Sequence, residues 1–277
     1  ARTVLAPNSW LATAAVGCRS SVRQSVCVAE IRANSVLPAR REQVLLRTAD
    51  GLTLVGELAR PLEAAPVATI VMVHPLPTHG GMMDSHLLRK ASWRLPALAE
   101  IAVLRFNTRG TASAAGASEG TFDEGRNEGL DVAAAIDWVV QTGLPTPWLV
   151  GWSFGTDVIL KHAELDPVRG AVLISPPRHY STAEDLERWA ATDRPVVALI
   201  PELDDYLRPE QAPAAFETLP RATLIPGPGA KHLWVGEPST RFVLDEIVRA
   251  VNPEYFDKNP GGLPSQWDGP MERWTDL

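Results

Sequence analysis

The sequence predicts an α/β fold built on a mostly parallel, eight-stranded sheet with helices on both faces. Apolar runs rich in β-branched residues alternate along the chain with segments of helical period, which is typical of parallel strands joined by helices. The chain has 277 residues, of which 45% are hydrophobic and 21% charged, as in one globular domain with some extensions. An Asp-Gly pair between the first two apolar runs also predicts a hairpin at the start of the sheet.

The first two strands, Gln43 to Thr48 and Leu52 to Ala59, are expected to pair antiparallel because Asp50 and Gly51 favour a tight turn between them. Six further strands are expected at Val67 to Val73, Ile101 to Phe106, Trp148 to Trp152, Ala171 to Ile174, Val196 to Ile200 and Ala222 to Ile225. Helical segments lie near 85–99, 123–141, 154–164, 210–217 and 240–250. A short helical segment around Ser181 to Thr192 is expected to form a minimal cap.

Charge and composition divide the chain into three parts. Residues 1–41 contain six arginines and one acidic residue, a net charge of +5 that leaves −12 for the rest, so we expect a basic N-terminal tail. An arginine-rich, acid-poor start is also compatible with a transit peptide. Residues 252–277 are rich in proline, glycine and charge without a regular apolar period, which predicts a C-terminal tail. The folded domain is therefore expected over residues 42–251.

The overall composition argues against several partners. With 33 acidic and 26 basic residues, the chain lacks the cationic surface that nucleic-acid binding requires. The longest strongly apolar run, Val67 to Val73, is far shorter than the roughly 18 residues of a membrane span. The two cysteines, Cys18 and Cys27, give no indication of an oxidising compartment. We therefore expect a cytoplasmic protein without nucleic-acid or membrane partners.

A candidate nucleophile lies in the pattern G-x-S-x-G, which places a serine on a sharp turn between a strand and a helix. The pattern occurs twice. Gly151 to Gly155 follows the apolar strand at 148–150 and opens a helical stretch, as such a turn requires. Gly116 to Gly120, around Ser118, lies in a polar loop without a preceding strand. We therefore expect Ser153 to be the nucleophile and Ser118 to be a structural residue.

A serine hydroxyl needs a base to take its proton, and the base follows the serine in folds of this kind. Three histidines follow Ser153 in the sequence. His162 is expected on the helix that leaves the turn, more than two turns away, and His179 in the cap segment. His232 follows the last strand in a loop, from which it can approach the serine above the sheet. His232 is therefore the expected base.

The acid that orients the base should follow the strand at 196–200, where Glu202, Asp204 and Asp205 all occur. Asp204 is preferred because the apolar Tyr206 and Leu207 follow it at the second and third positions and can anchor the turn. Asp205 remains an alternative, since a proline stands four residues after it.

Acyl transfer also needs two N–H donors for the developing oxyanion. One is expected from Phe154, directly after the nucleophile. The loop from His74 to Gly81 contains two prolines, which lack an N–H, so Leu76 is the natural second donor. His74 and His79 could instead be metal ligands, but with Asp84 they do not form a closed ligand set. No metal is therefore expected.

Five segments in order resemble the prokaryotic α/β-hydrolases related to dienelactone hydrolase. They are His74 to Gly81, Arg105 to Gly110, Ser118 to Asp123, Gly151 to Gly155 and Gly229 to His232. The resemblance covers roughly residues 42–251 and implies an α/β-hydrolase fold with Ser153, Asp204 and His232 as a catalytic triad. Relatives usually carry a second histidine where this chain has Leu76, a departure that alters the pocket wall without removing a catalytic group.

The sequence thus predicts a serine hydrolase that cleaves small-molecule carboxylic esters through an acyl-serine intermediate, without a cofactor. Trp152, Tyr206 and Trp234 flank the predicted triad in the sequence and are expected to bind substrate, with packing in the core or at the rim as the alternative role. A thioesterase, a peptidase or an acyltransferase could use the same residues. A non-catalytic binding protein on the same scaffold is the alternative from another class.

Overall fold

The computed structural model describes residues 28–273. Its centre is an eight-stranded sheet in the order β11-β10-β9-β8-β4-β5-β3-β2. Strand β3 pairs antiparallel with β2 and β5, and the remaining pairs are parallel. The strands are β2 (Arg40–Arg47), β3 (Thr53–Arg60), β4 (Ala68–Val73), β5 (Ile101–Phe106), β8 (Pro147–Trp152), β9 (Ala171–Ile174), β10 (Val196–Pro201) and β11 (Thr223–Gly227). The predicted α/β-hydrolase sheet, including its antiparallel first hairpin, is confirmed.

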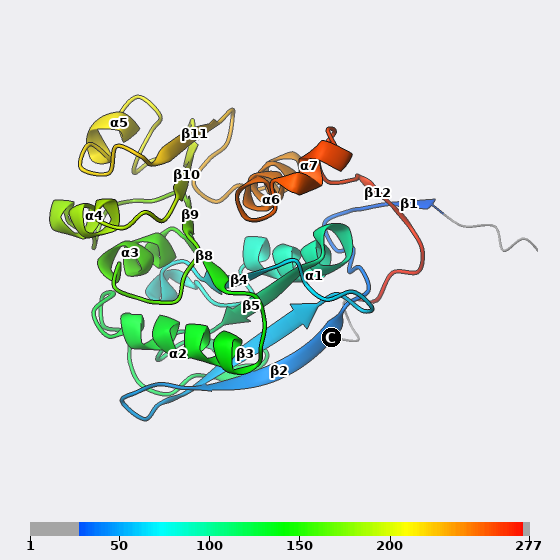
Figure 1. Cartoon of the computed structure of the whole chain (residues 1–277), viewed down its shortest axis with the longest axis horizontal. Coiled ribbons are helices and arrows are strands. Elements are labelled where there is room, and N and C mark those ends of the chain that lie inside the picture. The colour runs from blue at the N-terminus through cyan, green and yellow to red at the C-terminus, as the bar shows by residue number, and fades with distance from the viewer. Residues whose placement is uncertain (1–27, 274–277) are drawn as a thin grey trace, which may run out of the picture.

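Helices cover both faces of this sheet (Figure 1). The helices are α1 (His86–Ala99), α2 (Glu128–Gln141), α3 (Phe154–Lys161), α4 (Ala183–Ala190), α5 (Ala212–Ala215), α6 (Glu237–Val251) and α7 (Glu254–Lys258), with a 3₁₀ turn η1 at Pro77–His79. Two short strands, β6 (Ala112–Ser113) and β7 (Gly116–Ala117), form a small ribbon in the loop after β5. In the described part of the chain, no helix is long and apolar enough to cross a membrane.

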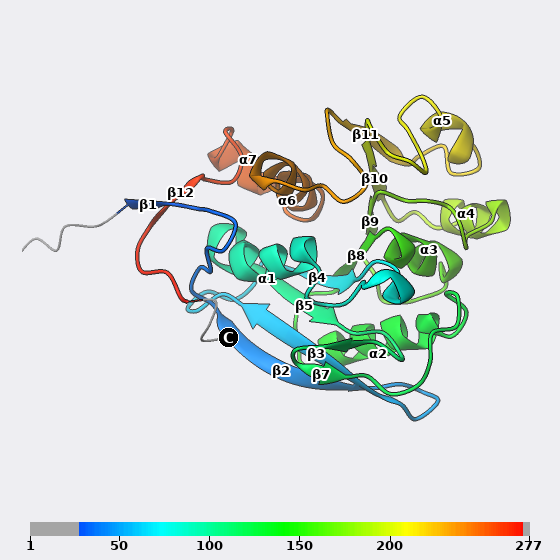
Figure 2. The ribbon, with the colours of Figure 1, turned by 180° about the vertical axis from the view of Figure 1, so that it is seen from behind.

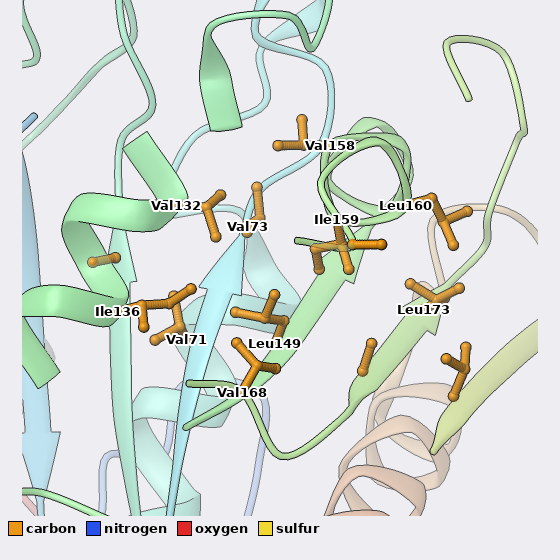
Figure 3. Close-up of a cluster of buried hydrophobic side chains, with 14 of the residues drawn as sticks. Val71, Val73, Val132, Ile136, Leu149, Val158, Ile159, Leu160, Val168 and Leu173 are labelled. Atoms are coloured by element: carbon orange, nitrogen blue, oxygen red, sulfur yellow. The ribbon is translucent and has the colours of Figure 1, made fainter. Parts of the chain in front are cut away.

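Successive side chains of a strand point to opposite faces of the sheet. Because helices cover both faces, the side chains of each central strand are buried on both sides. In β4, Val71 and Val73 join the core beneath α2 and α3, whereas Ile70 and Met72 join the core beneath α1 and α6. Figure 3 shows the first of these cores, in which valines and leucines from the strands meet valines, isoleucines and a leucine of α2 and α3. The unbroken apolar runs in the sequence reflect this two-sided burial.

The segment predicted as a small cap flanks the sheet instead. Helix α4 begins with a capping box between Thr182 and Asp185. Its Trp189 is 1% exposed and donates a hydrogen bond from Nε1 to the carbonyl of Ile159 in α3 at 3.0 Å. The amphipathic face of α4 thus packs against α3, on the side of the sheet. The expectation of a cap at 181–192 is therefore corrected.

The predicted tails are wrong for the residues that the structure describes. Strand β1 (Val28–Glu30) pairs antiparallel with β12 (Gln266–Asp268), and both views of the ribbon show them side by side (Figure 2). Between β1 and β2, Val36 and Leu37 are fully buried, and Leu37 N–H donates to Trp93 O at 2.9 Å. Residues 28–41 and 252–273 therefore belong to the domain. Residues 1–27, with Cys18 and Cys27, and residues 274–277 lie outside the described residues.

Candidate active site

Ser153 stands at the turn between β8 and α3 with φ 52° and ψ −119°, a backbone conformation that strongly disfavours any side chain. The turn is tight enough to exclude side chains at its two glycines. A Cβ on Gly151 would lie 2.6 Å from the backbone of Gly155, and one on Gly155 would lie 2.2 Å from the carbonyl oxygen of Val73. The G-x-S-x-G pattern is therefore required by the geometry, and it holds the Ser153 hydroxyl above the sheet.

His232 lies between Ser153 and Asp204. Its Nε2 is 2.8 Å from Ser153 Oγ, and its Nδ1 is 3.0 and 3.1 Å from the two carboxylate oxygens of Asp204. This arrangement fits an imidazole that donates from Nδ1–H to the carboxylate and accepts the Ser153 proton at Nε2. The three side chains come from loops after β8, β10 and β11, which meet at the carboxyl edge of the sheet.

The other candidates for the triad lie elsewhere. Asp205 and Glu202 are exposed, and Glu202 accepts a hydrogen bond from the amide of Gly229. His162 is 2.9 Å from the carbonyl of Gly125 through Nε2 and has Glu164 at its other nitrogen. His179 is exposed on the loop after β9.

Ser118 has the structural surroundings that its sequence context predicts. Its hydroxyl donates to Asn107 O at 2.7 Å and accepts from Val55 N–H at 3.0 Å. The side chain is 6% exposed, so it links the loop after β5 to β3.

The loop after β4 is held by a neutral histidine. His74 is fully buried; its Nδ1 is 2.7 Å from Pro75 O, and its Nε2 is 3.1 Å from Thr108 N. Burial lowers the pKa of His74 to about 4, since a charged imidazole there would lose its hydration. The ring therefore donates to the Pro75 carbonyl and accepts from the Thr108 amide. His74 thus fixes the entry of the loop that carries Leu76.

Leu76 and Phe154, the two expected oxyanion donors, lie beside Ser153. Both residues line the same cavity as Ser153. The carbonyl of Leu76 accepts hydrogen bonds from the amides of His79 and Gly81 at 3.0 Å, which closes the turn. The Leu76 N–H makes no hydrogen bond to a backbone group of the described residues. Phe154 is the first residue of α3, so its N–H has no partner within the helix.

Ser153 lies where two cavities meet. The larger, about 410 Å³, is lined by residues that include His86, Trp152, His232 and Leu233. The smaller, about 240 Å³, is lined by residues that include Phe154, Asp157, Pro177 and Tyr180. Four residues line both cavities, namely Leu76, His79, Ser153 and Tyr206. The serine can therefore contact a molecule that extends to both sides.

Of the three residues predicted to bind substrate, two line these cavities. Tyr206 is 62% exposed, with its ring 4.7 Å from that of His232. Trp152 is 2% exposed and meets His86 edge-on at 5.1 Å while its Nε1 donates to His232 O at 3.2 Å. Trp152 therefore forms the floor of the larger cavity and supports the loop of His232.

The prediction for Trp234 is wrong. Its side chain is 1% exposed, stacks on Phe242 at 5.7 Å and donates from Nε1 to Ser175 Oγ at 2.7 Å. A positive φ of 49° at Trp234 redirects the chain, so that the ring enters the core while His232, two residues earlier, faces the site. Ser175 also donates to the His232 carbonyl at 3.0 Å. Trp234 thus supports the His232 loop from below.

Sequence reasoning missed most of the cavity walls. Pro177 and Tyr180 follow β9, and His86 begins α1 after the loop that carries Leu76. Loops at the carboxyl edge of a parallel sheet surround its ligand site, so the position of Pro177 and Tyr180 after a predicted strand was an available signal. The position of His86 depends on a long-range contact, in which its Nε2 lies 2.7 Å from Leu233 O.

Comparison of the amino-acid sequence with known proteins gives a match over part of the chain. No protein-family model matches the chain. It is 32% identical over 116 residues to RP471, an uncharacterised protein of Rickettsia prowazekii (strain Madrid E), a match that covers 41% of this chain and 46% of that protein. The matched region thus spans about half the length of that relative.

Solved structures match over most of the chain. XC6422 of Xanthomonas campestris, described as an α/β serine hydrolase without lid, is 28% identical with a TM-score of 0.63, covering 78% of this chain and 97% of that one. A serine hydrolase homologue of Coxiella burnetii is 24% identical (TM-score 0.62; 75% and 96% covered). The esterase Pf2001 of Pyrococcus furiosus is 18% identical (TM-score 0.62; 83% and 94% covered).

These two more distant structures show the fold alone, and the narrower resemblance to relatives of dienelactone hydrolase stays a prediction. The eight-stranded sheet, the sharp turn at Ser153 and the similarity to XC6422 agree with one another. The chain is a member of the α/β-hydrolase superfamily.

Proposed function

We propose that this protein is a serine hydrolase that cleaves carboxylic esters through an acyl-Ser153 intermediate. The observation that carries the proposal is the continuous contact from Ser153 Oγ to His232 Nε2 at 2.8 Å and from His232 Nδ1 to Asp204 at 3.0 Å. A hydroxyl becomes a competent nucleophile when a base lies within hydrogen-bond reach and a third group orients that base. The description of XC6422 as an α/β serine hydrolase supports the same reaction class.

In the acylation step, His232 takes the proton from Ser153 Oγ as the oxygen attacks the ester carbonyl carbon. The carbonyl π electrons move to oxygen, and the Leu76 and Phe154 amides hydrogen-bond to the resulting oxyanion. The carbonyl then re-forms as the bond to the alcohol oxygen breaks, and His232 returns the proton to the leaving alcohol. Asp204, 2% exposed, holds the imidazole in the required tautomer and stabilises its charged form.

Deacylation repeats these steps with water. His232 takes a proton from water, the oxygen attacks the acyl carbon, and the same amides stabilise the second oxyanion. Collapse of this intermediate returns the proton to Ser153 Oγ and releases the carboxylic acid. The two steps use only residues of the site and water.

A fluorophosphonate probe tests the nucleophile directly. We expect the probe to label Ser153, as located by mass spectrometry, and the Ser153→Ala variant to lose both labelling and hydrolysis of 4-nitrophenyl esters. Ser118→Ala is the matched control, because this serine has the same flanking pattern but a structural place. Absence of label, or label on Ser118, would contradict the proposal.

Parallel substrates distinguish the related reactions. Thioesters, amides and an added alcohol acceptor test for a thioesterase, a peptidase and an acyltransferase that use the same three residues. Faster turnover with any of these than with matched oxygen esters would replace ester hydrolysis as the assigned activity. Ligand binding without labelling or turnover would instead indicate a binding protein on this scaffold.

A further inference from the structure

The two cavities at Ser153 have different chemical surroundings. We call them the larger arm and the smaller arm of the cleft. His232 lines the larger arm, together with His86, Trp152 and Leu233. Phe154, whose N–H is an expected oxyanion donor, lines the smaller arm with Pro177 and Tyr180. The cleft is therefore asymmetric about the reacting hydroxyl.

This asymmetry determines which part of an ester enters which arm. The general acid must lie within hydrogen-bond reach of the oxygen that it protonates, so the leaving alcohol oxygen has to be on the His232 side of the reacting carbon. His232 lines the larger arm only. The alcohol portion therefore extends into the larger arm. The acyl portion, bonded to the same carbon, extends past the Phe154 amide into the smaller arm.

Aromatic rings form the inner wall of the smaller arm. Tyr180 meets Phe154 edge-on at 5.5 Å, and Phe122 meets Phe154 at 5.2 Å and Tyr180 at 6.4 Å. Edge-on aromatic contacts of this kind stabilise one another and resist displacement. The wall on this side is consequently a packed cluster.

The loop that carries Tyr180 is pinned from beneath by Asp157. The Asp157 carboxylate is fully buried and accepts hydrogen bonds from Ser181 Oγ at 2.6 Å, Ser181 N at 3.1 Å and His179 N at 3.2 Å. Because a buried carboxylate is costly to leave unpaired, these bonds fix the loop on both sides of Tyr180. The smaller arm is thus unsuited to widening for a long chain.

The two arms differ in size. The smaller arm has a volume of about 240 Å³ and the larger arm a volume of about 410 Å³. The alcohol arm therefore has room for a longer group than the acyl arm.

We propose, on the basis of the proposed ester hydrolysis, that Ser153 acts on esters of a short acyl group and a longer alcohol. The acyl group lies in the smaller arm, which Phe154 and Tyr180 line. The alcohol lies along Trp152, His86 and Leu233. The position of His232 in the larger arm determines where the acyl and alcohol portions of the substrate lie.

A pair of isomeric esters tests this assignment. Decyl butanoate and butyl decanoate contain the same atoms and both release an alkanol, so they differ in which side carries the long chain. A decanoyl group has less room in the smaller arm, of about 240 Å³, than a decyl alcohol has in the larger arm, of about 410 Å³. Since a buried methylene is worth roughly a fourfold change, we expect kcat/KM to be at least about tenfold higher for decyl butanoate.

Two variants show which arm holds which portion. Tyr180→Ala removes a ring from the wall of the smaller arm and so enlarges that arm. We expect it to raise kcat/KM for butyl decanoate, and thereby to lower the ratio of kcat/KM for decyl butanoate to that for butyl decanoate at least about threefold. Leu233→Ala removes a half-exposed side chain from the alcohol arm. It should raise the KM for decyl butanoate while the dependence on acyl length stays that of the unchanged protein.

The outcomes separate this proposal from the proposed function. An enzyme that is labelled at Ser153 but hydrolyses both isomers equally, or prefers butyl decanoate, would overturn the assignment of the arms and leave ester hydrolysis standing. The assignment is also overturned if Leu233→Ala, and not Tyr180→Ala, changes the dependence on acyl length. A protein that neither hydrolyses any ester nor reacts with the probe would overturn both proposals.

Discussion

Asp204 and Asp205 are neighbours in the sequence with opposite surroundings. Asp204 is 2% exposed, contacts His232 Nδ1 and accepts a hydrogen bond from the Tyr206 amide at 2.9 Å. Asp205 is exposed to solvent, where its charge is screened. The turn after β10 thus directs one carboxylate into the site and the other away from it.

This difference predicts unequal effects of two matched substitutions. Asp204→Asn keeps the shape of the side chain but allows the wrong imidazole tautomer, a change worth on the order of 10⁴ in kcat in a Ser-His-Asp triad. Asp205→Asn should lower kcat by about tenfold or less, through distant electrostatics. Steady-state kinetics at pH 7 measures both, with thermal unfolding to show that each variant folds. A larger loss at Asp205 would contradict the contact seen at His232.

Because the backbone of Ser153 is strained, we expect its replacement by glycine to raise the free energy of unfolding while activity is lost. A side chain at φ 52° and ψ −119° costs on the order of 1–3 kcal/mol, and glycine removes that cost. Glycine also raises the conformational entropy of the unfolded chain, which lowers the free energy of unfolding by about 0.4–1 kcal/mol. The net increase in the free energy of unfolding is therefore roughly 1 kcal/mol.

The matched comparison is Ser153→Gly against Ser153→Ala, since both lose the contact with His232 but only alanine keeps a Cβ. We expect Ser153→Gly to have the higher Tm, by about 2–4 °C for a chain of this size. A lower Tm for Ser153→Gly than for Ser153→Ala would show that the turn is unstrained, because only the cost of glycine in the unfolded chain would then remain.

At the scale of elements, the segment between β1 and β2 behaves as part of the core. Leu37 is fully buried, and its backbone bonds to Trp93 and Arg41 hold the segment against α1. Leu37→Ala keeps these backbone bonds and removes only the side chain. We expect it to lower the free energy of unfolding by about 2–5 kcal/mol.

The control for this substitution is Leu45→Ala in β2, where the side chain is 62% exposed and the expected change is within about 0.5 kcal/mol. Chemical denaturation of the three proteins gives both differences. A loss at Leu37 no larger than that at Leu45 would mean that residues 28–39 do not pack on the domain in solution.

The sequence predicts the elements of the sheet well because their signals are local. Strands buried on both faces appear as unbroken apolar runs, and Asp50 with Gly51 marks the hairpin between β2 and β3. The β1–β12 pair has no such signal. It joins Val28 to Asp268, at opposite ends of the described chain, and its strands are too short for a readable period. Charge and proline content therefore suggested tails.

The candidate site shows the same division. Ser153, Asp204, His232 and the loop at Leu76 are predictable because each follows a recognisable strand. Trp234 was misplaced because closeness in sequence does not fix the direction of a side chain, and a positive φ turned its ring into the core. Tyr180 and His86 reach the cleft through loop and helix positions that only tertiary packing determines.

At the scale of the whole molecule, the site is assembled at one edge of the sheet from loops far apart in the chain. The loops after β4, β8, β10 and β11 bring Leu76, Ser153, Asp204 and His232 together. The contacts that hold these loops in place therefore stabilise the fold and also position the residues of the site. The buried His74 is one place where the link can be measured, because it joins the Leu76 loop to the Thr108 amide.

Burial gives His74 a pKa of about 4 in the folded protein, against roughly 6.5 in an unfolded chain. Between these values the unfolded chain binds a proton that the folded protein does not, so the folded state loses stability as the pH falls. The loss begins near pH 6.5 and is complete below about pH 4. Its size is about 3 kcal/mol, from the difference between the two pKa values.

Urea denaturation between pH 7 and pH 4 measures this dependence. Glutamine in place of His74 can still donate and accept hydrogen bonds but does not titrate. The free energy of unfolding of His74→Gln should therefore fall by about 3 kcal/mol less than that of the unchanged protein between pH 7 and pH 4. This difference does not depend on the stability of the variant at pH 7. His79→Gln makes the same substitution at an exposed position on the same loop, so it is the matched control for the loss of a buried imidazole. An unchanged slope in His74→Gln would show that His74 is not held neutral in the folded protein, and that the Thr108 amide is bound in some other way.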